Sequence, residues 1–517
     1  MKLIYDVGDR PKFGKLIVFS FQQLLAIITA TIIVPVIVNG ATGTNMLDSA
    51  AALVGAGFGT IVYLLFTKGR SPVFLGSSFA FIGPLIGACS FGYWGIILGA
   101  CFAGLVYIII AIVVKFAGSK WVNKVMPPAV IGPTVALIGL SLAKNAVGDI
   151  SKASTIAGGS YNLVAILCGI VTFAIIVFCS VRGTKTMKLI PFIIGILGGY
   201  IVASLFSAIG YGANVEYLQI VDFSALKNNF APVTVRSFFN LPNFTMAHNA
   251  DGFTAQGVAN IALLYIPVAF VVFAEHIADH KNISSIIERD LLVNPGLHRT
   301  LLGDGVGSII GALFGGCPNT TYGESIGCVA ITKNASVVSI LGAAILAIVF
   351  AFISPIMAFI QTIPSCVMGG VCLSLYGFIA VSGLTMLQKV DLSESKNLFV
   401  VSSILIAGIG GLSLKFGGTV AQPIIEISSI ATALVLGICV NAFVKPKKDK
   451  TSKSLPSGHI EAAANVADTE KQNEIANNAI LEVENNTNSQ IVVDATSNNV
   501  NTEIVADVAS TTETKEN

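Results

Sequence analysis

Two acidic residues and two histidines lie close together in VVFAEHIADHK, residues 271–281. Glu275 and His276 follow directly after a run of apolar residues, and Asp279 and His280 come one helical turn later. An ionisable side chain inside an apolar span costs several kcal/mol, so it is kept there for a purpose. This stretch is therefore the first candidate functional site.

Glu275 and Asp279 are four residues apart, so on a helix they share one face. Two like charges on that face disfavour each other in an apolar medium, and we expect at least one carboxyl group to hold a proton near neutral pH. A carboxyl group that gains and loses a proton is what a proton-driven carrier needs. The alternative is that Asp279 and His280 already lie among lipid headgroups, where charge costs little.

A further carboxylate, Glu324, lies in CPNTTYGESIG, a short polar break between apolar runs. It follows Gly323 at the expected start of a half-helix, where the helix dipole favours negative charge. Glu324 then either faces a ligand or only caps that helix. Gly76 and Gly323 would let a ligand approach bare backbone.

Three aromatic residues near the breaks, Phe79, Tyr322 and Tyr376, could stack on a flat ring. The alternative for each is ordinary core packing. Phe79 and Tyr322 are favoured because they lie on the broken segments themselves.

The composition is that of a membrane protein. Of the 517 residues, 54% are hydrophobic and only 11% are charged, whereas a soluble domain carries about 25% charged residues. No long basic patch argues for nucleic acid. The nine cysteines have no metal-ligand spacing and read as small core residues, so no metal and no cofactor is expected.

Fourteen apolar runs are near the ~20 residues that cross a bilayer. They cover residues 16–39, 46–67, 71–89, 93–116, 127–146, 161–181, 187–208, 256–279, 297–316, 319–333, 336–359, 364–386, 397–415 and 421–445.

Two of these runs, 71–89 and 319–333, are interrupted by polar residues and glycine, and each is the third of a set of seven. Interrupted segments at matching positions of two halves indicate a transporter site. An odd number of spans in each half requires opposite topologies, which predicts an inverted repeat. The two breaks should face each other, because irregular backbone at membrane depth must be buried in protein or line a cavity.

Basic residues follow every even-numbered run, so both termini are expected in the cytoplasm. The segment 209–255 would then lie outside the cell. The tail from residue 446 begins basic and becomes rich in Asn, Thr, Ala and Glu, which predicts a disordered cytoplasmic tail.

The chain resembles the nucleobase–ascorbate, or nucleobase:cation symporter-2, family, and most closely its bacterial uracil permeases. The stretches that carry the resemblance are FQQLLAIITATIIVPV (21–36), FLGSSFAFIGP (74–84), FAEHIADH (273–280), RDLLVNPGLHRTLLGDG (289–305), PNTTYGESIGCVAIT (318–332) and IPSCVMGGVCLSLYG (363–377).

The resemblance implies an all-α polytopic fold of fourteen transmembrane segments in a 7+7 inverted repeat, with short β-strands in segments 3 and 10. Its implied parts are core residues 1–125, gate residues 126–210, an extracytoplasmic loop at 211–255, core residues 256–360, gate residues 361–446 and a tail at 447–517.

The resemblance also implies roles for individual residues. Glu275 and Glu324 would accept hydrogen bonds from nucleobase N–H groups, and the backbone amides of Phe79 and Gly323 would meet its carbonyl groups. Ala30, Phe79, Tyr322 and Tyr376 would line the pocket, with Glu275 and Asp279 coupling the proton.

Two departures from the family pattern bear on the substrate. Gln22-Gln23 replaces a common Gln-His pair, and Asp279 stands where some uracil carriers have histidine. Uracil import by proton symport at the cell membrane is the expected function, and xanthine or uric acid symport is the alternative. A homodimer through the gate domain is a candidate assembly. An anion transporter of the same fold is disfavoured by the carboxylates. An enzyme is disfavoured because the broken segments contain no nucleophile–base pair.

Overall fold

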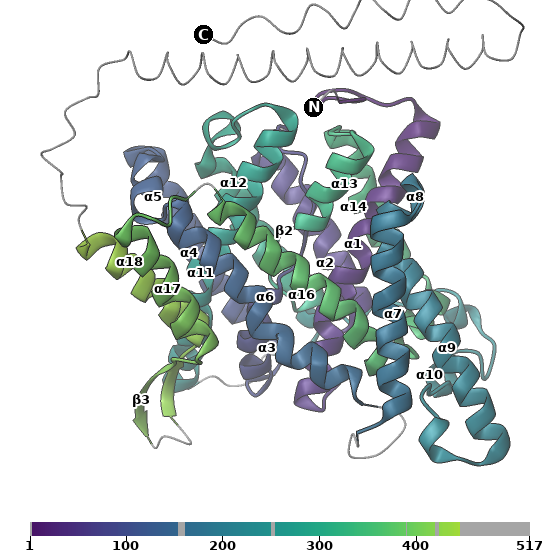
Figure 1. Ribbon diagram of the computed structural model, residues 1–517. Helices are drawn as coiled ribbons and strands as arrows, with labels where there is room; N and C mark the ends of the chain where they lie inside the picture. Colours follow the sequence, from purple (N-terminus) through teal and green to yellow (C-terminus); the bar gives the residue numbers. More distant parts are fainter. Residues whose placement is uncertain (1–2, 153–160, 250–253, 389, 419–422, 445–517) are drawn as a thin grey trace, which may run out of the picture. The chain divides into compact units, whose positions relative to one another are not determined.

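The computed structural model describes residues 3–152, 161–249, 254–388, 390–418 and 423–444. These ranges are mostly helical (Figure 1), and eight of their helices are long and apolar enough to cross a membrane. The expected helical, polytopic membrane fold is confirmed. The other six predicted spans correspond to shorter or less apolar elements, so fourteen crossings remain a prediction. The predicted tail at 447–517 lies outside the described residues.

The elements of the first half are α1 (Phe13–Thr42), α2 (Ser49–Phe66), β1 (Leu75–Ser77), η1 (Phe79–Phe81), α3 (Ile82–Cys89), α4 (Gly92–Ala117), α5 (Lys120–Val125), α6 (Pro128–Ile150), α7 (Leu163–Arg182), α8 (Lys185–Leu189) and α9 (Pro191–Ala213). The connecting segment holds η2 (Glu216–Leu218), α10 (Ser224–Asn229), η3 (Val235–Ser237) and η4 (Thr245–Ala247). The second half holds α11 (Ala255–Ile287), η5 (Leu292–Gly296), α12 (Leu297–Gly315), β2 (Asn319–Thr321), α13 (Gly323–Thr332), α14 (Val337–Ala351), α15 (Ser354–Gln361), α16 (Ser365–Leu387), α17 (Ser395–Ile409), β3 (Leu414–Gly418), β4 (Pro423–Ile427) and α18 (Ser429–Phe443).

Side-chain caps begin several of the long helices. Asp48 accepts a hydrogen bond from Ala50 N at the start of α2, and Asn162 and Thr254 do the same for α7 and α11. Within the helices the backbone groups pair with one another, as an apolar surrounding requires. Large apolar side chains such as Ile109, Ile170 and Leu205 remain exposed, which suits contact with lipid.

The third and tenth apolar runs are broken, as predicted. Each holds a three-residue strand followed by a short helix, and β1 pairs with β2 in antiparallel register. The paired residues are Leu75 with Thr321, Gly76 with Thr320 and Ser77 with Asn319. The two breaks, far apart in sequence, therefore meet in one place.

The helices pack in a regular set of partners. The most extensive contacts join α6 to α16, α2 to α12 and α4 to α12, and α7 lies along α9 as α17 lies along α18. Small residues allow the close approach, because a Cβ on Gly55 of α2 would collide with the carbonyl oxygen of Gly311 on α12.

One region of the second half differs from the expected helices. Helix α17 ends at Ile409, and β3 and β4 form an antiparallel hairpin, which includes residues assigned to the last two predicted spans. The prediction of continuous apolar spans at 397–415 and 421–445 is wrong here. Gly411 has φ +74°, which ends the helical path, and the Ile-rich segment after Pro423 suits a strand.

Candidate functional site

A cavity of about 530 Å³ lies between the paired breaks, α11, α13, α9 and α16. Lys188, Asn282 and Ile331 contribute to its lining. They lie at the face where α1 begins and where α11 and α13 end, called the N-terminal face below (Figure 1). Six predicted site residues line the same cavity: Phe79, Glu275, Asp279, Tyr322, Gly323 and Glu324.

The backbone of the breaks is satisfied by neighbouring helices as well as by strand pairing. Leu75 N donates to Thr60 Oγ1 at 2.9 Å, and the Thr60 hydroxyl donates to Leu75 O at 3.2 Å. On the other strand, Asn319 Nδ2 donates to Gly55 O at 3.0 Å. Helix α2 thus holds both breaks, and irregular backbone is tolerated at this depth.

Tyr322 fixes the geometry where β2 meets α13. Its hydroxyl donates to Ser77 O at 2.8 Å, and its ring covers Gly76 so closely that a Cβ there would collide with the ring. Only glycine fits at position 76 beside this ring. Tyr322 therefore forms part of the cavity wall and also binds the two breaks together.

Gln23, one of the two departures from the family pattern, lies in a node beside the breaks. Its Nε2 donates to Ser325 Oγ and, at 3.3 Å, to Ser325 O. Ser325 Oγ also accepts from Phe74 N at 3.0 Å. Gln23 therefore connects α1 to α13 directly beside Glu324 and steadies that half-helix.

The three carboxyl groups have different surroundings. Asp279 Oδ2 accepts a hydrogen bond from Thr321 Oγ1 at 2.7 Å. Glu324 lies in the first turn of α13, where the helix dipole favours negative charge. Glu275 Oε2 is buried and has no hydrogen-bond partner among the described residues. A buried acceptor without a partner is costly, and this oxygen has its hydrogen-bonding capacity free.

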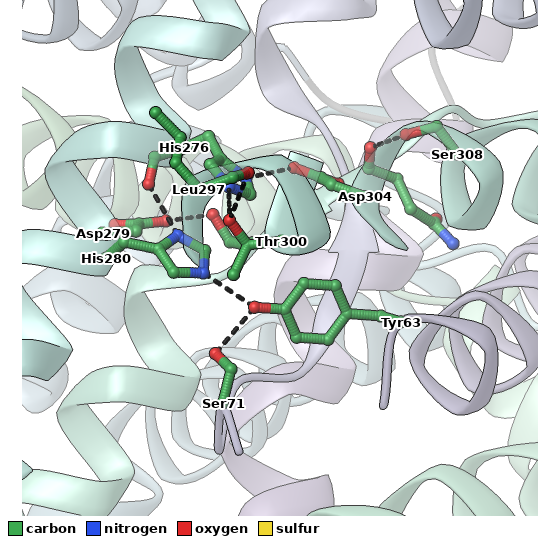
Figure 2. Close-up of polar contacts among 11 residues, drawn as sticks. Tyr63, Ser71, His276, Asp279, His280, Leu297, Thr300, Asp304 and Ser308 are labelled. Carbon is green, nitrogen blue, oxygen red and sulfur yellow. Dashed lines mark hydrogen bonds and ion pairs between the residues drawn. The ribbon is translucent and has the colours of Figure 1, made fainter. Parts of the chain in front are cut away.

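His276 does not line the cavity, and its ring lies against Asp304 and Thr300 of α12 (Figure 2). His276 Nδ1 is 2.6 Å from Asp304 Oδ2, and Nε2 is 3.0 Å from Thr300 Oγ1. All three side chains are fully buried. They fix the rotation of α11 against α12 and so hold Glu275 and Asp279 on the cavity side.

His280 ties α11 to α2 in the same way (Figure 2). Its Nδ1 is 2.8 Å from His276 O, which can only accept, so Nδ1 carries the proton. In the neutral ring Nε2 then accepts from the Tyr63 hydroxyl at 2.7 Å. Tyr63 in turn lies 2.7 Å from Ser71 Oγ.

Two residues of the opening motif are enclosed by protein. Asp279 is 6% exposed and His280 is fully buried. Neither side chain is therefore exposed on the outer surface of the helices, and their depth in the membrane stays a prediction. Asp304 was not among the residues expected from the sequence, although it is a lone carboxylate in an apolar run and the reasoning used for Glu275 applies equally to it.

Two predicted pocket residues lie outside the cavity lining. Ala30 is buried within α1, and Tyr376 lies beside Phe79 with ring centroids 5.7 Å apart and nearly perpendicular planes. Their predicted contact with a substrate stays a prediction. Tyr376 packs against Phe79 from the α16 side. The substrate-binding roles expected for Glu275, Glu324, Phe79, Gly323, Tyr322, Ala30 and Tyr376 remain predictions.

Known proteins with similar sequences include several uracil permeases. The chain is 40% identical to that of Bacillus caldolyticus over 457 residues, covering 88% of this chain and 97% of that one. It is 38% identical to that of Bacillus subtilis (strain 168), covering 89% and 99%. With that of Escherichia coli (strain K12) it shares 36% identity, covering 85% and 93%.

Solved structures with a similar fold are membrane transporters of low sequence identity. The transmembrane domain of the cyanobacterium bicarbonate transporter BicA matches with TM-score 0.52 and 14% identity, covering 84% of this chain and 100% of that one. The murine anion transporter Slc26a9, in its inward-facing state, matches with TM-score 0.55 and 10% identity, covering 84% and 68%. These likenesses concern the fold alone. Since residues 14–415 match the sequence model of the Permease family (Xan_ur_permease), the chain belongs to that family of transporters and is not an enzyme.

Proposed function

We propose that this permease imports uracil across the cell membrane by proton symport. The proposal is supported by the similarity to uracil permeases and by the grouping of Glu275, Asp279 and Glu324 on one cavity with an aromatic wall. Uracil is a flat ring with N–H donors and carbonyl acceptors, so a pair of carboxylates and two backbone amides match its edge.

The observation that carries the proposal is the unpartnered, buried Glu275 Oε2 facing the same cavity as Glu324. The two glutamates accept from ring N–H groups, and Phe79 N and Gly323 N donate to ring carbonyls. A Cβ on Gly323 would meet nothing within 4 Å, so the backbone there is open to a ligand. Tyr322 packs against the ring, and Ala30 and Tyr376 back the pocket.

Proton coupling lets the membrane potential drive a neutral substrate. One charge crossing the membrane is worth about 2.3 kcal/mol per 100 mV. Glu275 and Asp279 lie one turn apart on α11, so a proton on either one relieves their repulsion. Protonation of this pair favours uracil binding, and the proton and uracil then cross together.

The architecture we propose is a fourteen-segment 7+7 inverted repeat. The support is that several pairs of packed segments in one half have a counterpart in the other half, found by exchanging segment n with segment n + 7. Segments 1 and 11 pack together (α1, α14), as do 8 and 4 (α11, α4), and segments 6 and 7 pack as do 13 and 14. Segments 2 and 9, 3 and 10, and 5 and 12 each pair across the proposed axis.

The core (1–125 and 256–360) and the gate (126–210 and 361–446) are the proposed moving parts. The cavity lies between them and extends to the N-terminal face, where basic residues gather. Basic loops mark the cytoplasmic side, so we assign both termini to the cytoplasm and the structure to an inward-facing state. Rocking of the core against the gate then exposes the site to the outside.

Uptake of labelled uracil into cells that lack their own carriers tests the proposal. Glu275→Gln should abolish accumulation while the protein still reaches the membrane, and a protonophore should abolish it in the parent. Normal accumulation by the variant would sink the central role of Glu275. Accumulation that persists with the protonophore would exclude proton coupling.

A purine substrate is the first alternative to uracil. Asp279, which replaces a histidine of some uracil carriers, favours xanthine and uric acid. Competition of uracil uptake by xanthine but not by 5-fluorouracil would select these purines.

Anion transport is the second alternative, and it is suggested by the fold likeness to BicA and Slc26a9. Three carboxyl groups on one cavity oppose it, because an anion site needs positive charge.

A further inference from the structure

A second cavity, of about 180 Å³, lies on the other side of Phe79. Phe79 lines both cavities, and it is the one residue that their linings share within the described chain. The smaller cavity holds roughly six times a water molecule's share of liquid volume, about 30 Å³. Phe79, 6% exposed and packed edge-on against Tyr376, is therefore a partition between two chambers.

The smaller chamber lies toward the face opposite the N-terminal face. Helix α6 begins at the N-terminal face, and Ser141 and Asn145 lie in its second half. Ser428, directly before α18, also lines the chamber. Its walls come from α3 and α11 on one side and from α6 and α18 on the other, so it lies between the proposed core and gate.

The polar side chains of this chamber differ in whether they already have a hydrogen-bond partner. The Ser141 hydroxyl donates to Ile138 O at 2.8 Å, and Ser428 Oγ accepts from Ala431 N at 3.4 Å. The side chain of Asn145 makes no hydrogen bond to any described residue, and Asn145 is exposed. Its amide offers a donor and an acceptor side by side, which is the complement of an N–H beside a carbonyl on a ring.

We propose that this chamber is a second nucleobase station on the outer half of the path, with Asn145 as its recognition residue. The inference rests on the proposed function. Apolar residues such as Ile82, Ile138 and Leu142 supply flat walls, and Asn145 pairs with the ring's amide edge. A base held here waits behind Phe79 until the core and gate move and the partition opens.

The test separates entry from central binding. Asn145→Leu should lower the initial rate of uptake at subsaturating external uracil about tenfold. The Kd of purified protein for uracil, measured by calorimetry in the inward-facing state, should stay within about twofold. Asn145→Gln keeps the amide and should restore most of the uptake. Lys144→Leu, one residue away and outside the lining, is the control for an added apolar side chain.

Unchanged uptake by Asn145→Leu would overturn the second station, as would a parallel loss of uptake and of central affinity. A loss that Asn145→Gln fails to restore would also overturn it. Parent protein that neither binds nor transports uracil would refute the proposed function itself, and that result is read from the parent before any variant is compared.

Discussion

Replacing Gly76 by alanine tests whether Tyr322 holds the two breaks together. The new Cβ would collide with the Tyr322 ring and lie 2.9 Å from its hydroxyl oxygen. The ring is buried and its hydroxyl is bonded to Ser77 O. It has little room to move, so the substitution must displace the ring and stretch or break that bond.

The expected cost follows from these two effects. Overpacking a close-packed site costs about 1–3 kcal/mol, and loss of the Tyr322 hydrogen bond costs about 1 kcal/mol. Together Gly76→Ala should destabilise the protein by about 2–4 kcal/mol. At roughly 2 °C per kcal/mol for a large chain, the Tm should fall by about 4–8 °C. Thermal unfolding of purified protein in one detergent, followed by fluorescence at a fixed scan rate, measures the shift.

Two matched variants make the reasoning refutable. Gly323→Ala places a Cβ in open space in the same site, so its Tm should stay within about 2 °C of the parent. In a Tyr322→Ala background the collision is gone, and Gly76→Ala should then cost less than about 0.5 kcal/mol. An unchanged Tm for Gly76→Ala alone, or an equal loss in both backgrounds, would show that the ring contact is not the cause.

Two more substitutions test contacts away from the cavity. Tyr63→Phe removes a buried hydroxyl bonded to Ser71 and His280. Because His280 Nε2 is then left unpaired, the free energy of unfolding should fall by about 1–3 kcal/mol. An unchanged Tm would mean that these bonds do not hold α2 to α11. Asp6→Ala removes an ion pair with Arg289 whose side chains are 41% and 54% exposed, so it should cost less than about 1 kcal/mol. A Tm loss above about 3 °C for Asp6→Ala would contradict this and give the N-terminal segment a larger structural role.

The coarse fold and part of the site could be predicted because a membrane-spanning segment requires a long, nearly uninterrupted run of apolar residues. Long apolar runs gave the spanning helices, and the breaks at Gly76 and Gly323 pointed to the meeting of β1 and β2. Glu275 and Glu324 could be selected because charge is rare at such positions. These signals are local, so they need no knowledge of which segments pack together.

What could not be predicted depends on partners distant in the chain. His280 meets Tyr63 across 217 residues, and His276 meets Asp304 across 28. A lone tyrosine in an apolar run does not indicate which distant residue it will bond to. The hairpin of β3 and β4 was missed because its isoleucines suit a strand and a spanning helix equally by hydropathy. The partition at Phe79 is a property of two cavities, which sequence cannot measure.

The pairing of β1 with β2 has a consequence for how the protein is made. Tyr322 lies 245 residues after Ser77, and chains grow at about 5–20 residues per second. On the order of 10–50 s pass between the synthesis of the two breaks at that rate. During that time the backbone of β1 has no strand to pair with, so the first half must wait in the membrane with an open, hydrated break or a temporary partner. Final closure of the third segment is therefore a late step of biogenesis, and a truncated chain that ends before residue 319 should be a substrate for membrane quality control.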